Sequence, residues 1–230
     1  MMKFLNSSIG KKTVMALSGG FLILFLLEHL YTNVSIFYGD GGASFNEASH
    51  SMVRMLLIRI IEIILFLAVF VHVAQALNLT RENSKARPIK YAVDGTSETS
   101  SWISRNMGFT GSIIFFFLVL HMYNFFVPYR ITGVVGGEGA DSVANSVATA
   151  LGNPIYAGIY LLSVIVLAMH LSHAVLSACH TLGLNNKKYF PILEKVSLGF
   201  ALLMGIGFGS FPILFYGAKI MGKDLLNWAM

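Results

Sequence analysis

The chain carries little charge and almost no cysteine. Only 12% of its 230 residues are Asp, Glu, Lys or Arg, whereas 55% are hydrophobic. A soluble domain keeps roughly 25% charged residues to cover its surface, so most of this surface is expected to face lipid. Cys179 is the single cysteine, which excludes an internal disulfide, a CxxC zinc or iron–sulfur site and the CxxCH attachment of a c-type haem.

Signals of other protein classes are missing too. The formal charge is +5, but the basic residues are scattered between apolar runs, so no nucleic-acid-binding face is expected. The N-terminus leads into an apolar run without a small-residue cleavage site, so no removed signal peptide is expected. No linker or low-complexity tract divides the sequence, and residues 1–230 are expected to form one transmembrane domain.

Five apolar segments are long enough to cross a membrane. A span needs about 20 mostly apolar residues at a rise of about 1.5 Å each. The segments between them are polar enough to be loops in water, at 38–52, 81–102, 129–152 and 183–191. The expected fold is therefore all-α, an integral membrane bundle of five transmembrane helices, over approximately 13–37, 54–80, 104–128, 153–182 and 192–217.

The distribution of Lys and Arg predicts the orientation of these helices. Basic residues collect on the cytoplasmic side of membrane proteins. If the N-terminus is inside and the C-terminus outside, five basic residues lie outside: Arg54, Arg59, Arg130, Lys219 and Lys223. Eleven then lie inside: Lys3, Lys11, Lys12, Arg81, Lys85, Arg87, Lys90, Arg105, Lys187, Lys188 and Lys195.

Histidines recur inside the predicted spans. Polar groups are costly in hydrocarbon and usually face the bundle interior with a role there. One such histidine could simply form an interhelical hydrogen bond, but that explanation is poor for one on each of four successive helices. The intramembrane histidines are His29, His72, His121, His170 and His173.

The arrangement of these histidines repeats along the chain. In the first span Ser18-Gly19 precedes His29 by eleven residues, and in the third Thr110-Gly111 precedes His121 by the same interval. Eleven residues at about 100° each return to within roughly 20° of the starting direction, so each hydroxyl shares a helix face with its histidine. The first two and the next two spans thus resemble two related halves.

Depth pairs the histidines into two sites. His29 and His121 are expected about 25 Å from the inner surface, and His72 and His170 roughly 12–18 Å from it. Two imidazoles leave a zinc ion short of ligands, whereas haem iron needs only two axial ligands. Four of the helices are therefore expected to form a dihaem core with two non-covalent, bis-His b haems. By depth alone, His173 matches His72 as well as His170 does.

Several short motifs together resemble a known family. They are E-H-L from Glu28 to Leu30, F-N-E-A-S-H-S-M from Phe45 to Met52, V-H-V around His72, M-G-F-T-G…L-H from Met107 to His121, and M-H-L-S-H-A-V-L-S-A-C-H-T-L-G-L-N-N from Met169 to Asn186. Over nearly its whole length the chain resembles the single-polypeptide, dihaem cytochrome b558 anchor of succinate dehydrogenase and fumarate reductase.

The resemblance implies a bacterial cytoplasmic-membrane anchor. It implies a flavoprotein subunit with FAD and an iron–sulfur subunit on the cytoplasmic side, and electron transfer through the inner and outer haems to a quinone. Menaquinone is the expected quinone, because relatives of this anchor type often use it. The glycine thirteen residues after the ligand in the family's fourth-helix motif corresponds to Gly183, which selects His170 over His173.

Other polar residues have weaker assignments. His50 and Glu47 fall in the outer-loop motif and, with Glu28, are candidates for the surroundings of the quinone site; a solvated loop histidine is the alternative for His50. Some fumarate reductase relatives carry a glutamate for proton movement two residues before the fourth-helix ligand, where this chain has Ala168. Gly19 and Gly111 would let a flat macrocycle approach the backbone, although small residues also serve helix packing.

The arginines have two competing explanations. Arg59 is three residues from Glu62, a spacing that favours an ion pair on one helix face. Alternatively, Arg59 or Arg130 would hold propionates of the outer haem and Arg105 those of the inner haem, because a guanidinium matches a carboxylate. His173 could likewise contact a propionate or a neighbouring helix.

Three other functions compete with the anchor. A dihaem cytochrome of another quinone-linked dehydrogenase or a hydrogenase would use similar histidine pairs. A transporter would use intramembrane His, Glu and Arg as an ion path and would need helices broken at mid-membrane; only Pro212 interrupts a predicted span. A scaffold without cofactor leaves the histidine pairs unexplained.

Overall fold

The protein is built from helices that run back and forth between two ends. The computed structural model describes residues 7–86, 100–133, 135, 142–184 and 186–227, and these contain no β-strand. Five helices in this part of the chain are long and apolar enough to cross a membrane. The prediction of an all-α, multi-pass membrane protein is confirmed.

The five spans follow the predicted runs in order, and three of them, at 8–37, 56–86 and 190–220, are longer than the runs that predicted them. They are α2 (Ser8–Val34) with the 3₁₀ turn η1 (Ser35–Phe37), α4 (Leu56–Ala86), α7 (Met107–His121) with η2 (Met122–Ile131), α9 (Pro154–Thr181) and α10 (Phe190–Ile220). Ser7 caps α2 by accepting a hydrogen bond from the Gly10 N–H at 3.1 Å. The ends extend because polar residues continue a helix into water, and Lys11 of α2 forms an ion pair there with Glu82 of α4.

Two of the expected loops contain helices. The segment 38–52 includes α3 (Ala43–Arg54), and the segment 129–152 includes α8 (Val143–Leu151), so the loop prediction was wrong for both. Each helix buries an apolar side, with Phe45 on α3 and Val147 on α8. A short helix α6 (Trp102–Arg105) precedes α7. Parts of the expected loops 81–102 and 129–152, and the basic residues Lys3, Arg87 and Lys90, lie outside the described residues.

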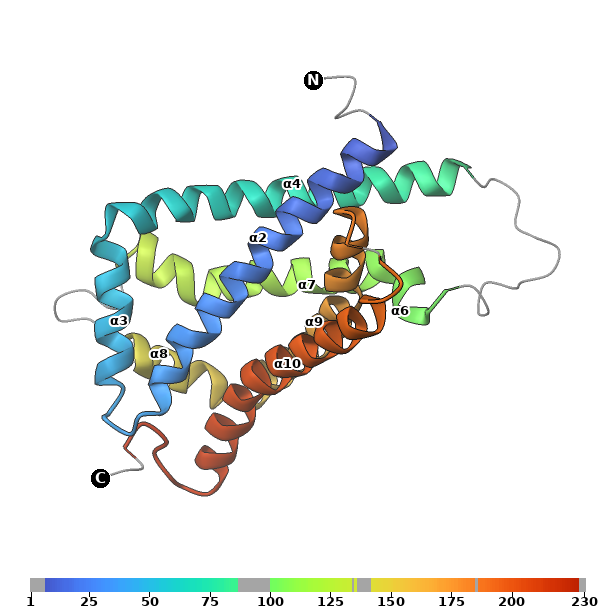
Figure 1. Ribbon diagram of the computed structural model, residues 1–230. Helices are drawn as coiled ribbons and strands as arrows, with labels where there is room; N and C mark the ends of the chain where they lie inside the picture. Colours follow the sequence, from blue (N-terminus) through green and yellow to red (C-terminus); the bar gives the residue numbers. More distant parts are fainter. Residues whose placement is uncertain (1–6, 87–99, 134, 136–141, 185, 228–230) are drawn as a thin grey trace.

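The helices cross between one end formed by α3 and α8 and another formed by α6 and the turn before α10 (Figure 1). α2 passes diagonally between α4 and α9, while α9 also packs against α7 and α10. At the α3 end, the Gly41 N–H donates to the Leu226 carbonyl at 2.9 Å, and the Ala144 N–H donates to Asn46 Oδ1 at 3.0 Å. These bonds join three segments that are distant in sequence into one cap.

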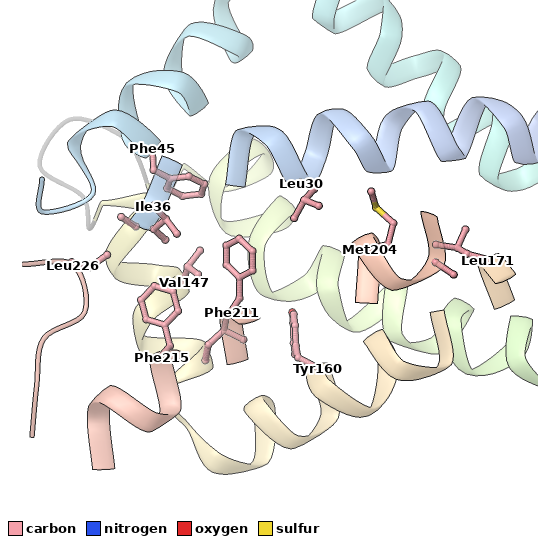
Figure 2. Packing of buried hydrophobic residues seen from close by; sticks show 13 residues of the cluster. Leu30, Ile36, Phe45, Val147, Tyr160, Leu171, Met204, Phe211, Phe215 and Leu226 are labelled. Carbon is pink, nitrogen blue, oxygen red and sulfur yellow. The ribbon is translucent and has the colours of Figure 1, made fainter. Parts of the chain in front are cut away.

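The best-buried apolar residues gather between α2, α9, α10 and this cap. Figure 2 shows Ile36, Phe45 and Leu226 together at the cap, with Phe211 and Phe215 of α10 beside them. No residue of α4 among those described is fully buried. The α3 end of the bundle is therefore the most tightly packed part, and α4 presents most of its surface to lipid.

The third span changes its helical winding just after His121. From Met122 to Ile131 the chain is a π-helix, and Pro128 lies inside it. Proline cannot donate a backbone hydrogen bond, and π-helical turns are frequent at functional sites. The sequence analysis ended this span at residue 128 and counted only Pro212 as an interruption, so the second proline was missed.

Candidate functional site

Four histidines on four spans come together as two pairs. The rings of His29 on α2 and His121 on α7 have their centroids 5.7 Å apart, with their planes 88° to one another. His72 on α4 and His170 on α9 lie nearer the other end, each against a helix that carries one member of the first pair. We call these the α3-end pair and the α6-end pair, after the end of the bundle that each lies nearer.

Each histidine of the α6-end pair contacts a hydroxyl on a neighbouring helix. Ser18 Oγ of α2 lies 3.3 Å from His72 Nδ1, and Thr110 Oγ1 of α7 lies 3.2 Å from His170 Nδ1. Both hydroxyl residues are buried, with 9% and 2% of their surfaces exposed. The same contact is therefore made twice, once in each half of the repeat.

The backbone fixes the direction of these hydrogen bonds. The Ser18 hydroxyl donates to the Met15 carbonyl at 3.1 Å, and the Thr110 hydroxyl donates to the Met107 carbonyl at 3.1 Å. A hydroxyl has one proton, so with that proton engaged its oxygen can only accept from the imidazole. In that arrangement Nδ1 of each histidine carries the proton, and Nε2 keeps its lone pair. That is the tautomer of a histidine that binds a metal through Nε2.

Two glycines provide the space in which these rings lie. A Cβ added to Gly19 would be 3.3 Å from His72 Cε1, and one added to Gly111 would be 3.7 Å from His170 Cε1. Each ring thus rests against the backbone of the helix that also supplies its hydroxyl partner. The pairs Ser18-Gly19 and Thr110-Gly111 form a cradle for the histidine of the neighbouring helix. The repeat of Ser18-Gly19 and Thr110-Gly111 is visible in the sequence. There the two hydroxyls were placed on the helix faces of His29 and His121, and their contacts with His72 and His170 were not predicted.

Aromatic rings surround the α3-end pair. Phe25 stacks on His29 at 5.2 Å, and Phe125 lies 5.4 Å from His121. Tyr160 of α9 is 6.1 Å from His121, and nothing in the sequence had singled it out. His121 Nδ1 is buried without a hydrogen-bond partner.

Asparagine and α10 complete the surroundings of His29. Asn33 Nδ2 lies 3.3 Å from His29 Nδ1 and donates to the His29 carbonyl at 2.6 Å. Phe208 of α10 lies 5.8 Å from the His29 ring. Phe208 brings the fifth span into direct contact with this site.

A polar cavity opens near the α3-end pair. It has a volume of about 520 Å³, and its lining includes Asn124, Asn145, Thr149, Tyr156 and Asp224. The Asn124 side-chain amide donates to the Tyr160 hydroxyl at 3.3 Å. The Tyr160 ring in turn lies beside His121, so this side chain stands between the Asn124 amide at the cavity and that histidine.

Two of the candidate arginines contact a carboxylate, and the third contacts a backbone carbonyl. Arg130 of η2 forms an ion pair with Glu62 of α4 at 2.5 Å, and Arg59 lies 3.9 Å from the same carboxylate. The predicted Arg59–Glu62 pair is present, but Arg130 is the closer partner. Arg105 is exposed at the opposite end of the bundle and donates to the Ser100 carbonyl.

The remaining candidates lie apart from the two pairs or at their margins. Glu28 is exposed and accepts from the Thr32 hydroxyl on its own helix at 2.7 Å. Glu47 is exposed on α3, and half-buried His50 meets the Tyr129 ring at 6.0 Å. His173 is half-buried, one helical turn from His170.

The donor set fits a haem better than a bare metal ion. Among the described residues, no group of three or more His, Cys, Asp or Glu side chains could hold a metal ion. Haem iron requires only two protein ligands. An imidazole nitrogen lies about 2 Å from a bound metal, so two axial rings have centres roughly 6 Å apart, comparable with the 5.7 Å between His29 and His121.

Comparison with known proteins adds no relative. No family model, no curated protein and no solved structure matches the chain.

Proposed function

We propose that this chain is the cytochrome b membrane anchor of a succinate:quinone oxidoreductase. His29 with His121, and His72 with His170, would each ligate one non-covalent haem b. When bound, the two haems supply one-electron carriers between an iron–sulfur partner and a membrane quinone. The chain would thus be part of an enzyme whose dicarboxylate site is on a partner subunit.

The observation that carries this proposal is the repeated hydroxyl–imidazole cradle. Ser18 and Thr110 hold the Nδ1 protons of His72 and His170, which leaves both Nε2 atoms as lone-pair donors. A histidine that only satisfied a buried hydrogen bond would not need this tautomer in both halves of the repeat. Partners of this kind orient metal-ligating histidines and increase their basicity.

The surroundings of the α3-end pair also suit electron transfer. The aromatic rings around His29 and His121 exclude water from the ligands, and bis-imidazole ligation leaves no open coordination position for oxygen chemistry. The polar cavity that leads through Asn124 to Tyr160 could admit a quinone headgroup from the α3 end. His50, Glu47 and Glu28 are the candidates from the sequence for that region.

The partners and the orientation of the chain are part of the proposal. The excess of Lys and Arg at the α6 end supports a cytoplasmic location for that end. The flavoprotein with FAD and the iron–sulfur subunit would bind there, in a bacterial cytoplasmic membrane, and electrons would reach menaquinone at the α3 end. The family resemblance of the sequence supports this assembly.

A pyridine haemochrome assay with a reduced-minus-oxidised spectrum tests the proposal. The purified chain should contain two b haems per polypeptide. His170→Ala should lose one haem, whereas the matched variant His173→Ala, one turn away on the same helix, should keep both. Circular dichroism and gel filtration would establish that each variant is folded. No haem in a folded, haem-matured wild-type preparation would overturn the proposal.

Co-purification separates the anchor from other haem-carrying functions. If the chain is isolated from its native membrane with a flavoprotein and an iron–sulfur subunit, and the preparation oxidises succinate, the anchor is supported. Two haems with a hydrogenase or formate dehydrogenase as partner would instead assign the chain to another quinone-linked enzyme.

A further inference from the structure

An apolar groove runs along the lipid-facing side of α4, α7 and η2. Its volume is about 440 Å³, and its lining is almost entirely apolar. Phe66 of α4 and Phe126 of η2 meet across it with ring centroids 5.3 Å apart. The remaining lining residues come from the third span: Leu118, Val119, Met122, Tyr123, Val127 and Ile131.

The groove has the length and direction of a lipid chain. Its lining on the third span extends over fourteen residues, from Leu118 to Ile131, which is roughly 15–20 Å at a helical rise. This direction runs along the span, as an acyl chain does in a bilayer. Val119, Tyr123 and Ile131 are 55%, 69% and 68% exposed, so the groove is open to lipid from the side.

Charged residues stand where the groove reaches the α3 end. Glu62 lies one turn before Phe66 on α4, and Arg130 immediately precedes Ile131 on η2. Arg130 and Arg59 share the single carboxylate of Glu62, at 2.5 and 3.9 Å, so the cluster has one positive charge in excess. The Arg59 side chain is 50% exposed and lies one turn before Glu62 on α4, which leaves its guanidinium accessible to an anion.

We propose that this groove binds an anionic phospholipid of the leaflet at the α3 end, with an acyl chain along Phe66 and Phe126 and the phosphate at Arg59. The apolar groove fits the chain, and the excess positive charge of the cluster of Arg59, Glu62 and Arg130 fits the headgroup. A guanidinium recognises a phosphate through paired hydrogen bonds. The site does not depend on the proposed haem function.

Lipid retention on the purified full-length protein tests this site. Native mass spectrometry in mixed micelles with equal amounts of phosphatidylglycerol and phosphatidylcholine should show one phosphatidylglycerol retained per chain. Arg59→Gln removes the exposed charge and leaves the Arg130–Glu62 pair, and should reduce the preference for phosphatidylglycerol about fivefold, the effect of one basic residue near anionic lipid. Lys219→Gln, which removes a cation at the same end on α10, should leave the preference unchanged.

A second variant separates the groove from the charge. Val119→Trp should fill the groove while retaining every charged residue, and should reduce retention of both lipids equally. Equal retention of the two lipids by the wild type, or an unchanged preference in Arg59→Gln, would overturn the proposal. Retention of a neutral isoprenoid lipid in place of phospholipid would also overturn it.

Discussion

Gly207 of α10 packs so closely against Leu30 of α2 that a Cβ at position 207 would lie 2.6 Å from Leu30 Cδ2. Leu30 is buried and follows His29 directly, and Phe208 contacts the His29 ring. The close approach of α10 therefore supports the packing around one of the candidate ligands.

Replacing Gly207 by Ala should destabilise the protein. Overpacking a core by a methyl group costs about 1–3 kcal/mol, which exceeds the roughly 1 kcal/mol that Ala gains over Gly in a helix. Thermal unfolding in detergent should therefore show a lower midpoint. Gly217→Ala is the control, since a Cβ there meets nothing within 4 Å, and it should be neutral or stabilising. Equal midpoints for the two variants would contradict this explanation.

Replacing the Thr110 hydroxyl should weaken the α6-end site specifically. Thr110→Val keeps the shape of the side chain but removes the acceptor for His170 Nδ1–H, and loss of such a partner typically costs 10–100-fold in metal affinity. A haem titration monitored by absorbance should show that one of the two haem sites binds haem more weakly. Thr110→Ser keeps the hydroxyl and should restore the affinity. If Val and Ser variants bind alike, the hydrogen bond does not position the ligand.

The Arg130–Glu62 ion pair should couple α4 to η2. A double-mutant cycle with Arg130→Gln and Glu62→Gln should give an interaction energy of about 0.5–3 kcal/mol in chemical unfolding. Either single variant leaves a charge without its partner, so the double variant should be less destabilised than the sum of the singles. Arg59→Gln should cost less than about 1 kcal/mol, because this side chain is half exposed and 3.9 Å from the carboxylate.

The start of α3 should depend on pH through Asp40. Hydrogen bonds from Ser44 and from the Gly42 N–H hold the pKa of this carboxyl below its ordinary value. A lowered folded-state pKa means that the stabilisation is complete at neutral pH and is lost as the pH falls through that pKa, below about 4. The rate of amide hydrogen exchange in α3 should be compared across this pH range, and it should increase as the pH falls. In Asp40→Asn the acid-dependent part of this change should disappear.

The spans could be predicted from the sequence, whereas the short helices could not. A run of about 20 apolar residues has few alternatives to crossing a membrane, because each backbone polar group must be satisfied inside the segment. α3 and α8 are short and contain many Ser, Asn and Ala residues, and tertiary contacts such as Asn46 with Ala144 help to stabilise them. Their composition alone is that of a loop.

The candidate site was predictable in its histidines but not in its partners. The spacing of Ser18 from His29 indicated a common helix face, but the residue that Ser18 contacts is on another helix. Helix periodicity cannot give the rotation of one helix against the next, which depends on packing. The same limit applies to Arg130, whose carboxylate partner is 68 residues away, and to Tyr160 beside His121.

The repeat of α2–α4 in α7–α9 implies approximate twofold symmetry about the membrane normal, a relation known for parallel repeats in other membrane proteins. α10 lies along α9 and reaches α2, and in the described residues no helix covers α4 and α7 in the same way. α10 is therefore the span that departs from this symmetry, and it gives the described part of the chain an odd number of spans. With five spans, reporter enzymes fused to the two termini should be active in opposite compartments, and the same fusions would show which side of the membrane each end of the bundle faces.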